Sequence, residues 1–231
     1  MKTNVQIFAF KKDGRLSLDI KERLFSFLKK DERVKISKFK RKEDRETALI
    51  SRGFLKKLLS QELKLPEKEI IFNYSKHERP FLKNFGENNF DFNVSHSGDW
   101  IVWILAESGR VGIDIEEVRP IEEDLVNSCF TPEEKDYIYG NQVFDLERFF
   151  ELWTLKEAFV KADGQGLSYS LQDFYFQTSP QIRLQGKPAG QSWYFKQYNL
   201  DPNYKMGACS SRNIFPTKVD VISNSGLLLR L

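Results

Sequence analysis

The sequence has little cysteine and no long apolar run, and both absences narrow the classes of protein that it can encode. Its 231 residues include only two cysteines, Cys129 and Cys209, and these lack the spacing of metal ligands. Their neighbours Phe130 and Ala208 indicate small buried apolar groups, which argues against a disulfide or a zinc site. No apolar run approaches the roughly 20 residues of a membrane span, and the first residues do not form a secretory signal. We therefore expect a cytoplasmic protein that does not bind membranes.

The residues that are present are typical of a folded globular protein with an uneven charge distribution. Hydrophobic residues make up 40% of the chain and aromatic residues 14%. Residues 21–57 contain 14 Lys and Arg against six Asp and Glu, whereas residues 107–157 contain five against 14. This division favours a polyanion bound by the first half and a cation held by the second. A nucleic acid is the alternative ligand for the basic stretch, but the acidic half and the lack of a nucleic-acid-binding motif argue against it.

Two short segments place acidic residues where they could hold a divalent cation. In residues 111–116 apolar residues alternate with the others, so strand geometry turns Asp114 and Glu116 to one face. Residues two apart on a strand lie roughly 6.5–7 Å apart, and both carboxylates can therefore reach one ion. In residues 153–161 helical spacing puts Glu157 and Lys161 on one side. For each segment alone, the alternative is a solvated surface.

The two segments together resemble the signature of the 4'-phosphopantetheinyl transferases. Members of this family carry a Gly-Ile-Asp-x-Glu strand and a Trp-x-x-Lys-Glu-x-x-x-Lys helix, which residues 112–116 and 153–161 match. Residues 92–97 resemble a third family segment, Phe-Asn-x-Ser-His-Ser. Residues 78–80 resemble the family's Gly-Lys-Pro turn, with Arg79 in place of the lysine. The resemblance covers roughly residues 32–210.

The resemblance implies an enzyme that transfers the 4'-phosphopantetheine group of coenzyme A to a serine of an apo acyl or peptidyl carrier protein. The serine hydroxyl would attack the β-phosphate and release 3',5'-adenosine bisphosphate, and we expect a monomer. One alternative is a catalytically silent scaffold that binds coenzyme A or a carrier protein, but no acid and no helix lysine of the signature is lost. Another alternative is a magnesium-dependent phosphohydrolase. Such an enzyme would usually need further metal ligands, and the sequence contains no second cluster of them.

The resemblance also implies roles for individual residues. Asp114, Glu116 and Glu157 would bind Mg²⁺, with Mn²⁺ as the other possible metal. Asp114, Glu157 and Lys161 would be the catalytic residues, and Glu157 would also accept the serine proton. The residues expected to contact the phosphates of coenzyme A are Arg33, Lys35, Arg45, Arg79, Ser95, His96, Lys156 and Lys161.

Two positions carry alternatives. Thr47 stands where the family often has an arginine, and Arg45 or Arg52 are the candidates to replace it. Lys161 could instead pair only with Glu157.

The expected fold is α+β, with two similar halves, residues 1–107 and 108–231, and the active site between them. Each half would pack a small antiparallel sheet on helices. The patterns predict strands at residues 5–10, 70–74, 100–106 and 111–116, the last two joined as a hairpin by residues 108–110. They predict helices at residues 21–28, 32–40, 45–63 and 146–162, and one that begins after Thr131. Asp31 would cap the second helix, Thr131 forms a capping box, and residues 164–168 resemble a Gly-x-Gly-Leu turn of the family.

Overall fold

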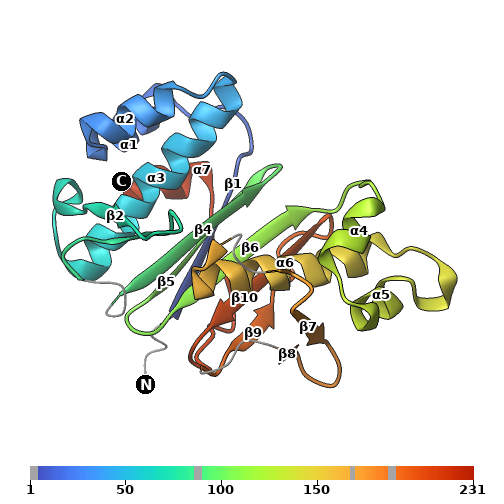
Figure 1. Cartoon of the computed structure of the whole chain (residues 1–231). Coiled ribbons are helices and arrows are strands. Elements are labelled where there is room, and N and C mark those ends of the chain that lie inside the picture. Colours follow the sequence, from blue (N-terminus) through green and yellow to red (C-terminus); the bar gives the residue numbers. More distant parts are fainter. Residues whose placement is uncertain (1–4, 86–89, 167–169, 187–190) are drawn as a thin grey trace.

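The structure is a computed structural model that describes residues 5–85, 90–166, 170–186 and 191–231 (Figure 1). The strands are β1 (Val5–Lys11), β2 (Phe72–Tyr74), β3 (Pro80–Leu82), β4 (Asp91–Ser97), β5 (Trp100–Ala106), β6 (Val111–Glu117), β7 (Phe174–Gln177), β8 (Arg183–Gly186), β9 (Tyr194–Gln197), β10 (Tyr204–Ser210) and β11 (Asp220–Ile222). The α-helices are α1 (Leu18–Phe27), α2 (Lys30–Ser37), α3 (Lys42–Leu63), α4 (Asp124–Cys129), α5 (Pro132–Ile138), α6 (Leu146–Asp163) and α7 (Asn224–Arg230). The expected α+β class is confirmed.

Two sheets form the centre of the molecule. The first has the strand order β11-β1-β5-β4, with β1, β5 and β4 antiparallel and β11 parallel to β1. The second has the order β6-β10-β9 and is antiparallel. Strands β2 and β3 pair separately, as do β7 and β8. No helix in the described ranges is long and apolar enough to cross a membrane.

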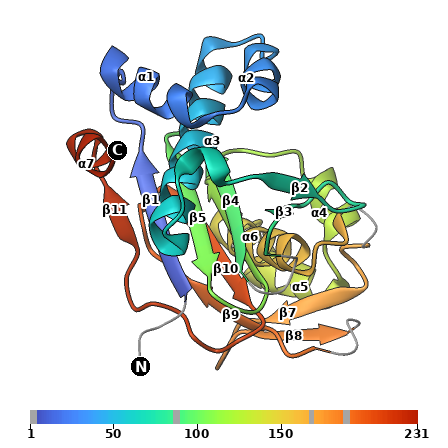
Figure 2. The ribbon, with the colours of Figure 1, turned by 90° about the vertical axis from the view of Figure 1, so that its left-hand side faces the viewer.

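Helices cover the outer faces of these two sheets (Figures 1 and 2). Helices α1 and α3 pack on the first sheet, where the ring of Trp103 meets that of Phe54 edge to face at 5.3 Å between centroids. The opposite face of the first sheet shares a second core with one face of the second sheet, through residues such as Ile104 and Ile113. Helix α6 and its neighbours form a third core on the far side of the second sheet.

Helix α6 lies unusually close to the second sheet because glycine occupies two strand positions beneath it. A Cβ atom at Gly112 of β6 would come within 2.0 Å of the carbonyl oxygen of Ala158, and one at Gly207 of β10 within 2.8 Å of that of Thr154. Residues 154 and 158 are one helical turn apart, so both glycines accommodate the same face of the helix. Glu157 directly precedes Ala158 in α6, so the close packing at Ala158 also holds Glu157 beside β6.

Strands β4 and β6 lie side by side as the adjoining edges of the two sheets. Their contact uses side chains instead of a backbone ladder: Val111 N donates to Asp91 Oδ2 at 2.8 Å, and Ile113 N to Asn93 Oδ1 at 3.0 Å. Glu117 N donates to Ser97 Oγ at 3.1 Å. The pairing residues keep a constant offset, so the two strands run parallel, and the polar side chains of Asp91, Asn93 and Ser97 accept from backbone N–H groups at the edge of β6.

Several expected elements are confirmed. The strands at residues 5–10, 100–106 and 111–116 are present, and α3 and α6 contain the expected helices of residues 45–63 and 146–162. The capping box of α5 is present, with Thr131 as the N-cap. Gly164 ends α6 with φ 80°, and the expected turn continues into residues 167 and 168, which lie outside the described residues.

Two expectations are wrong. Strands β5 and β6 belong to different sheets, so residues 108–110 do not close a hairpin. Helix α2 has Lys29 as its N-cap, and Asp31 lies inside its first turn. Residues 220–222 pair with β1, so this strand near the end of the chain joins the first sheet.

Candidate active site

A cavity of about 620 Å³ lies between helices α2 and α3 of the first half and strand β6 and helix α6 of the second. It brings together seven of the residues that the sequence singled out: Lys35, Ser95, His96, Asp114, Glu116, Glu157 and Lys161. These residues come from four elements that are far apart in the chain. The cavity is therefore our candidate active site.

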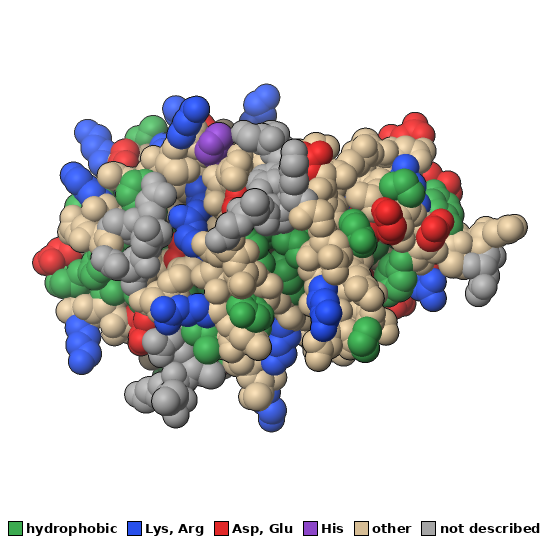
Figure 3. Space-filling view, turned by 60° about the horizontal axis from the view of Figure 1, so that its bottom comes forward, with side chains coloured by type: hydrophobic (Ala, Val, Ile, Leu, Met, Phe, Trp, Pro, Cys, Tyr) green, Lys and Arg blue, Asp and Glu red, His purple; other side chains and the backbone are tan. Residues whose placement is uncertain are grey.

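The wall formed by the second half is acidic. Asp114 and Glu116 project from β6 and Glu157 from α6, and Asp114 is 2% exposed. Acidic side chains also gather at the right-hand end of the face in Figure 3, where α4 and α5 lie in Figure 1, whereas Lys and Arg are spread over its left and centre. The charge division of the sequence is thus visible in the folded chain.

Lys161 bonds to this acidic wall. Its Nζ lies 2.6 Å from Asp114 Oδ1 and 3.1 Å from Ser95 Oγ, and Ser95 Oγ in turn donates to Asp114 Oδ1 at 2.8 Å. The ion pair of Lys161 is with Asp114 on another element, so the alternative of a pair with Glu157 alone is wrong.

The two other carboxylates of the wall are hard to ionise together. Burial raises the pKa of Glu157, and the charges of Asp114 and Glu116 raise it further, against the lowering effect of Lys161. Burial likewise raises the pKa of Glu116, which accepts a hydrogen bond from Ser97 Oγ at 2.6 Å. A bound cation would relieve this mutual repulsion.

One buried oxygen of the wall supports a cation ligand. Asp114 Oδ2 is buried and has no hydrogen-bond partner among the residues that the structure describes, which is costly for a carboxylate oxygen unless something else binds it. Oxygen donors are the ligands that Mg²⁺ prefers. As the side chains stand, however, no three His, Cys, Asp or Glu residues of the described ranges are close enough to hold one metal ion. The residue types fit a hard divalent cation, and a three-carboxylate site stays a prediction.

The wall formed by the first half is basic. Lys35 lies over the ring of Tyr74, with Nζ 4.7 Å from the centroid. Arg52 lines the same cavity and donates to Tyr74 Oη at 2.8 Å, with Glu32 3.7 Å away. Of the two candidates to replace an arginine at position 47, only Arg52 lines the cavity; Arg45 instead donates to the carbonyl oxygens of residues 39 and 40.

His96 stands near the end of β4 and lines the cavity beside Ser95, which contacts Asp114. Partial burial in the cavity lowers the pKa of His96, and the positive charges of Lys12 and Lys161 lower it further. Asp44 acts in the opposite direction. The imidazole therefore meets more positive than negative charge, as expected of a group that contacts phosphate.

Arg33 does not line the cavity. Its Nε donates to the carbonyl oxygen of Leu28 at 2.9 Å, and its guanidinium lies 4.5 Å from the ring centroid of Phe25. Arg33 lies two residues before Lys35 on α2, and residues two apart on a helix do not share a face. Of the basic residues expected to contact phosphates, Arg33 and Arg45 therefore do not line the cavity, whereas Lys35 does, and so does the alternative candidate Arg52.

Arg79 is a structural brace in this fold. Its guanidinium binds both oxygens of Asp91 at 2.8 Å and also donates to the carbonyl oxygens of Val111 at 2.9 Å and Lys161 at 2.7 Å. It ties together β4, β6 and the last turn of α6, and it does not line the cavity. The expected phosphate contact of Arg79 is corrected, because its donors are committed within the protein.

Lys156 is also buried away from the cavity. Its Nζ lies 2.8 Å from Glu134 Oε2 and donates to the carbonyl oxygens of Leu171 and Phe174 at 2.6 and 2.8 Å. Both charged groups are 0% exposed. Burial lowers the pKa of Lys156 while Glu134 raises it, which is the pattern of a charge held in the interior by its partner. The expected phosphate contact of Lys156 is wrong.

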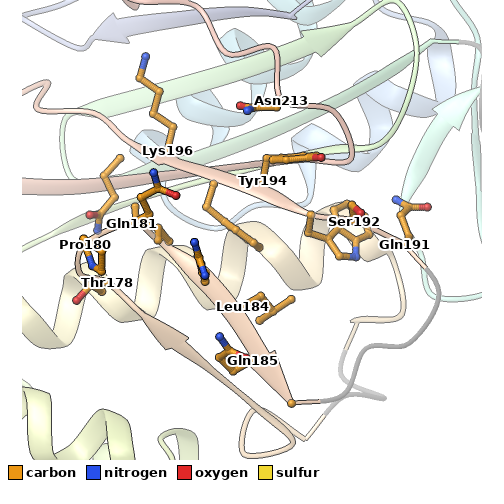
Figure 4. Close-up of a pocket in the computed structure, with 16 residues that line it drawn as sticks. Thr178, Pro180, Gln181, Leu184, Gln185, Gln191, Ser192, Tyr194, Lys196 and Asn213 are labelled. Carbon is orange, nitrogen blue, oxygen red and sulfur yellow. The ribbon is translucent and has the colours of Figure 1, made fainter.

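A larger cavity, of about 860 Å³, lies between β8 and β9 (Figure 4). Its described lining consists mainly of amide, hydroxyl and apolar side chains, among them Gln181, Gln185 and Tyr194, and includes no Asp, Glu or His. Size alone therefore does not identify the active site, and the smaller cavity holds the groups that can do chemistry.

Comparisons with known proteins match both halves of the chain. Residues 19–108 match a family model described as "4'-phosphopantetheinyl transferase, N-terminal", and residues 110–209 match one described as "4'-phosphopantetheinyl transferase superfamily". The 4'-phosphopantetheinyl transferase Sfp of Bacillus subtilis (strain 168) is 29% identical, over 97% of this chain and 100% of its own. The 4'-phosphopantetheinyl transferase ffp of Bacillus subtilis is 30% identical over the same shares, and psf-1 of Bacillus pumilus is 30% identical over 91% and 90%.

Proposed function

Because the chain belongs to the 4'-phosphopantetheinyl transferase superfamily, we propose that it transfers 4'-phosphopantetheine from coenzyme A to a serine of an apo carrier protein. The family makes it a transferase of this group. Our proposal adds coenzyme A as the donor, a Mg²⁺ requirement and 3',5'-adenosine bisphosphate as the second product. A cytoplasmic monomer and a division of the chain at residue 107 also stay predictions.

The observation that carries the proposal is that one cavity has a basic wall and an acidic wall. Lys35, Arg52 and His96 provide donors and positive charge for the phosphates of coenzyme A. Asp114, Glu116 and Glu157 lie opposite. Coenzyme A carries three phosphate groups, whose negative charge is complementary to this basic wall, and the acids explain why a cation would accompany them.

The acidic wall would hold the metal through Asp114, Glu116 and Glu157, with the unpartnered Asp114 Oδ2 as one ligand. When bound, Mg²⁺ would neutralise charge on the phosphates and on the departing group. Lys161, bonded to Asp114 and Ser95, would orient this carboxylate and contribute a positive charge near the reacting phosphate. Glu157 lines the same cavity from α6 and would accept the proton of the attacking serine.

A silent scaffold would keep the fold but lose part of this wall. Asp114, Glu116, Glu157 and Lys161 are all present in the cavity, which favours the enzyme.

The test is a transfer assay. Purified protein, coenzyme A and Mg²⁺ should convert an apo carrier protein into a species heavier by one phosphopantetheine, as read by intact-mass spectrometry. Reactions without coenzyme A, or with a chelator, are the controls. If carriers of the fatty-acid, polyketide and peptide types all stayed unmodified, the proposal would be wrong and the scaffold would be the better explanation.

A further inference from the structure

Lys12 is a cation beside the active site that is held by a neutral hydroxyl. Its Nζ donates to Thr47 Oγ1 of α3 at 3.1 Å, and it forms no ion pair with a residue of the described ranges. Its neighbour Lys11, by contrast, is paired with Asp201 at 3.0 Å. A lysine held by a neutral hydroxyl keeps its full charge for a ligand.

The backbone places Lys12 close to His96. Lys12 N donates to the carbonyl oxygen of Asp99 at 2.8 Å, and Asp99 lies in the turn that follows β4. The charge of Lys12 is, after burial, the largest of the causes that lower the pKa of His96. Two groups that can each carry positive charge are therefore close enough for the charge of one to act on the other across the space between them.

This space adjoins the active site. Lys12, Thr47 and Asp99 line a cavity of about 290 Å³, and Ala48, the residue after Thr47, lines the larger cavity together with His96. Two glutamates, Glu43 and Glu46, also line the smaller cavity. Glu46 is paired with Lys21 at 2.7 Å, so it does not neutralise Lys12.

We propose that Lys12, oriented by Thr47, binds a phosphate monoester of the substrate in the space that it shares with His96. This inference rests on the proposed function and names a residue that the sequence patterns did not select. The pyrophosphate of coenzyme A has to meet the wall of Asp114 and Lys161, where transfer takes place. The remaining phosphate of coenzyme A is the monoester on the 3' carbon of the ribose, and it is the group left for Lys12. Lys12, which directly follows β1, thus supplies the positive charge that an arginine at position 47 would otherwise provide.

The experiment compares coenzyme A with 3'-dephospho-coenzyme A, which differs only in this phosphate. Their dissociation constants are measured by calorimetry with Mg²⁺ for the wild type, Lys12→Met, Lys12→Arg and the control Lys11→Met. Lys12→Met should weaken coenzyme A binding by about 10- to 100-fold, the usual effect of losing a bond between charged groups. It should leave 3'-dephospho-coenzyme A binding nearly unchanged. Lys12→Arg should keep most of the affinity, and Lys11→Met should bind both compounds as the wild type does.

An equal loss of affinity for both compounds in Lys12→Met would overturn the inference, because Lys12 would then not contact the 3'-phosphate. Unchanged affinity for coenzyme A would overturn it as well. If the wild-type protein bound neither compound, the proposed function itself would be overturned. If the wild type and Lys12→Met both bound coenzyme A normally, only the role of Lys12 would be overturned.

Discussion

Helix α6 carries two lysines that each pair with a carboxylate, and the two pairs serve different purposes. Lys156 and Glu134 are both 0% exposed and lie 2.8 Å apart. Lys161 is 28% exposed and lies 2.6 Å from Asp114. The distances are nearly equal, so the strength of contact does not distinguish the pairs.

The difference lies in the oxygens that remain. Glu134 also accepts from the backbone N–H groups of Phe176 at 3.0 Å and Thr131 at 3.1 Å, so both of its oxygens are used within the protein. Asp114 leaves its buried Oδ2 without a partner. A pair whose bonds are complete holds the fold together, whereas a pair with a buried oxygen left over has the capacity to bind a ligand.

The largest effect should come from Asp114→Ala. This change removes the carboxylate that has the unpartnered oxygen, so transfer should fall by orders of magnitude. The free energy of unfolding in chelator should change little, because relief of the repulsion with Glu116 and Glu157 offsets the loss of the bonds from Lys161 and Ser95. Intact-mass assays and urea unfolding measure the two quantities. Normal transfer by this variant at low Mg²⁺ would contradict the model of the acidic wall.

Glu157→Gln should have the next largest effect and tests the role of the helix carboxylate. Glutamine keeps the size and one oxygen but cannot accept a proton, so we expect a rate lower by about 10²–10⁴-fold. Excess Mg²⁺ should not restore the rate if Glu157 accepts the serine proton. Recovery of most of the rate at high Mg²⁺, in a titration of initial rates, would show that Glu157 is only a ligand.

Lys156→Met tests the structural pair. It leaves the Glu134 carboxylate buried without a counter-charge, and the free energy of unfolding should fall by about 3–5 kcal/mol. Lys161→Met is the matched control on the same helix: it should cost less stability, because Lys161 is partly exposed, but should lower transfer far more. Urea unfolding and the transfer assay read both outcomes.

A double variant tests whether the unpaired charge of Glu134, and not lost packing, destabilises Lys156→Met. Glu134→Gln combined with Lys156→Met removes both charges and keeps an oxygen for one of the two N–H groups of Thr131 and Phe176. It should recover much of the stability lost in Lys156→Met alone. A double variant as unstable as the single one would mean that packing, and not the unpaired charge, accounts for the loss.

The sequence predicted neither of these two pairs, because each joins residues that are far apart in the chain. Glu157 and Lys161 are four apart on a helix and share a face, whereas Lys156 is one residue from Glu157 and cannot share that face. Helical geometry therefore turns Lys156 away from the face of Glu157 and Lys161, which the motif alone does not reveal. Asp114 and Glu116 line one cavity as expected, because alternation along a strand fixes their common side.

Other features depend on contacts that no local pattern reveals. Arg79 matches a family turn, but its direction is set by Asp91, which the fold brings to it. Strand β11 pairs with β1 from the other end of the chain, joining Phe8 to Asp220. Helix α2 begins at Lys30 because Glu32 Oε2 accepts from Lys29 N at 2.9 Å. The carboxylate of Glu32, inside the first turn, thus takes the place of the cap expected at Asp31.

The smallest predicted effect concerns His96, which should make the free energy of unfolding depend on pH. The Lys156–Glu134 pair does not involve this residue. Burial, followed by the charges of Lys12 and Lys161, lowers the pKa of His96 from its ordinary value of 6.5, and Asp44 opposes this. Between the lowered pKa and 6.5 the unfolded chain binds the proton more readily than the folded protein. The free energy of unfolding should therefore fall as the pH drops through this range. His96→Gln should flatten this part of the profile and His77→Gln should not, in urea unfolding across a pH series. A His96→Gln profile parallel to that of the wild type would mean that the positive charge around the cavity does not act on His96.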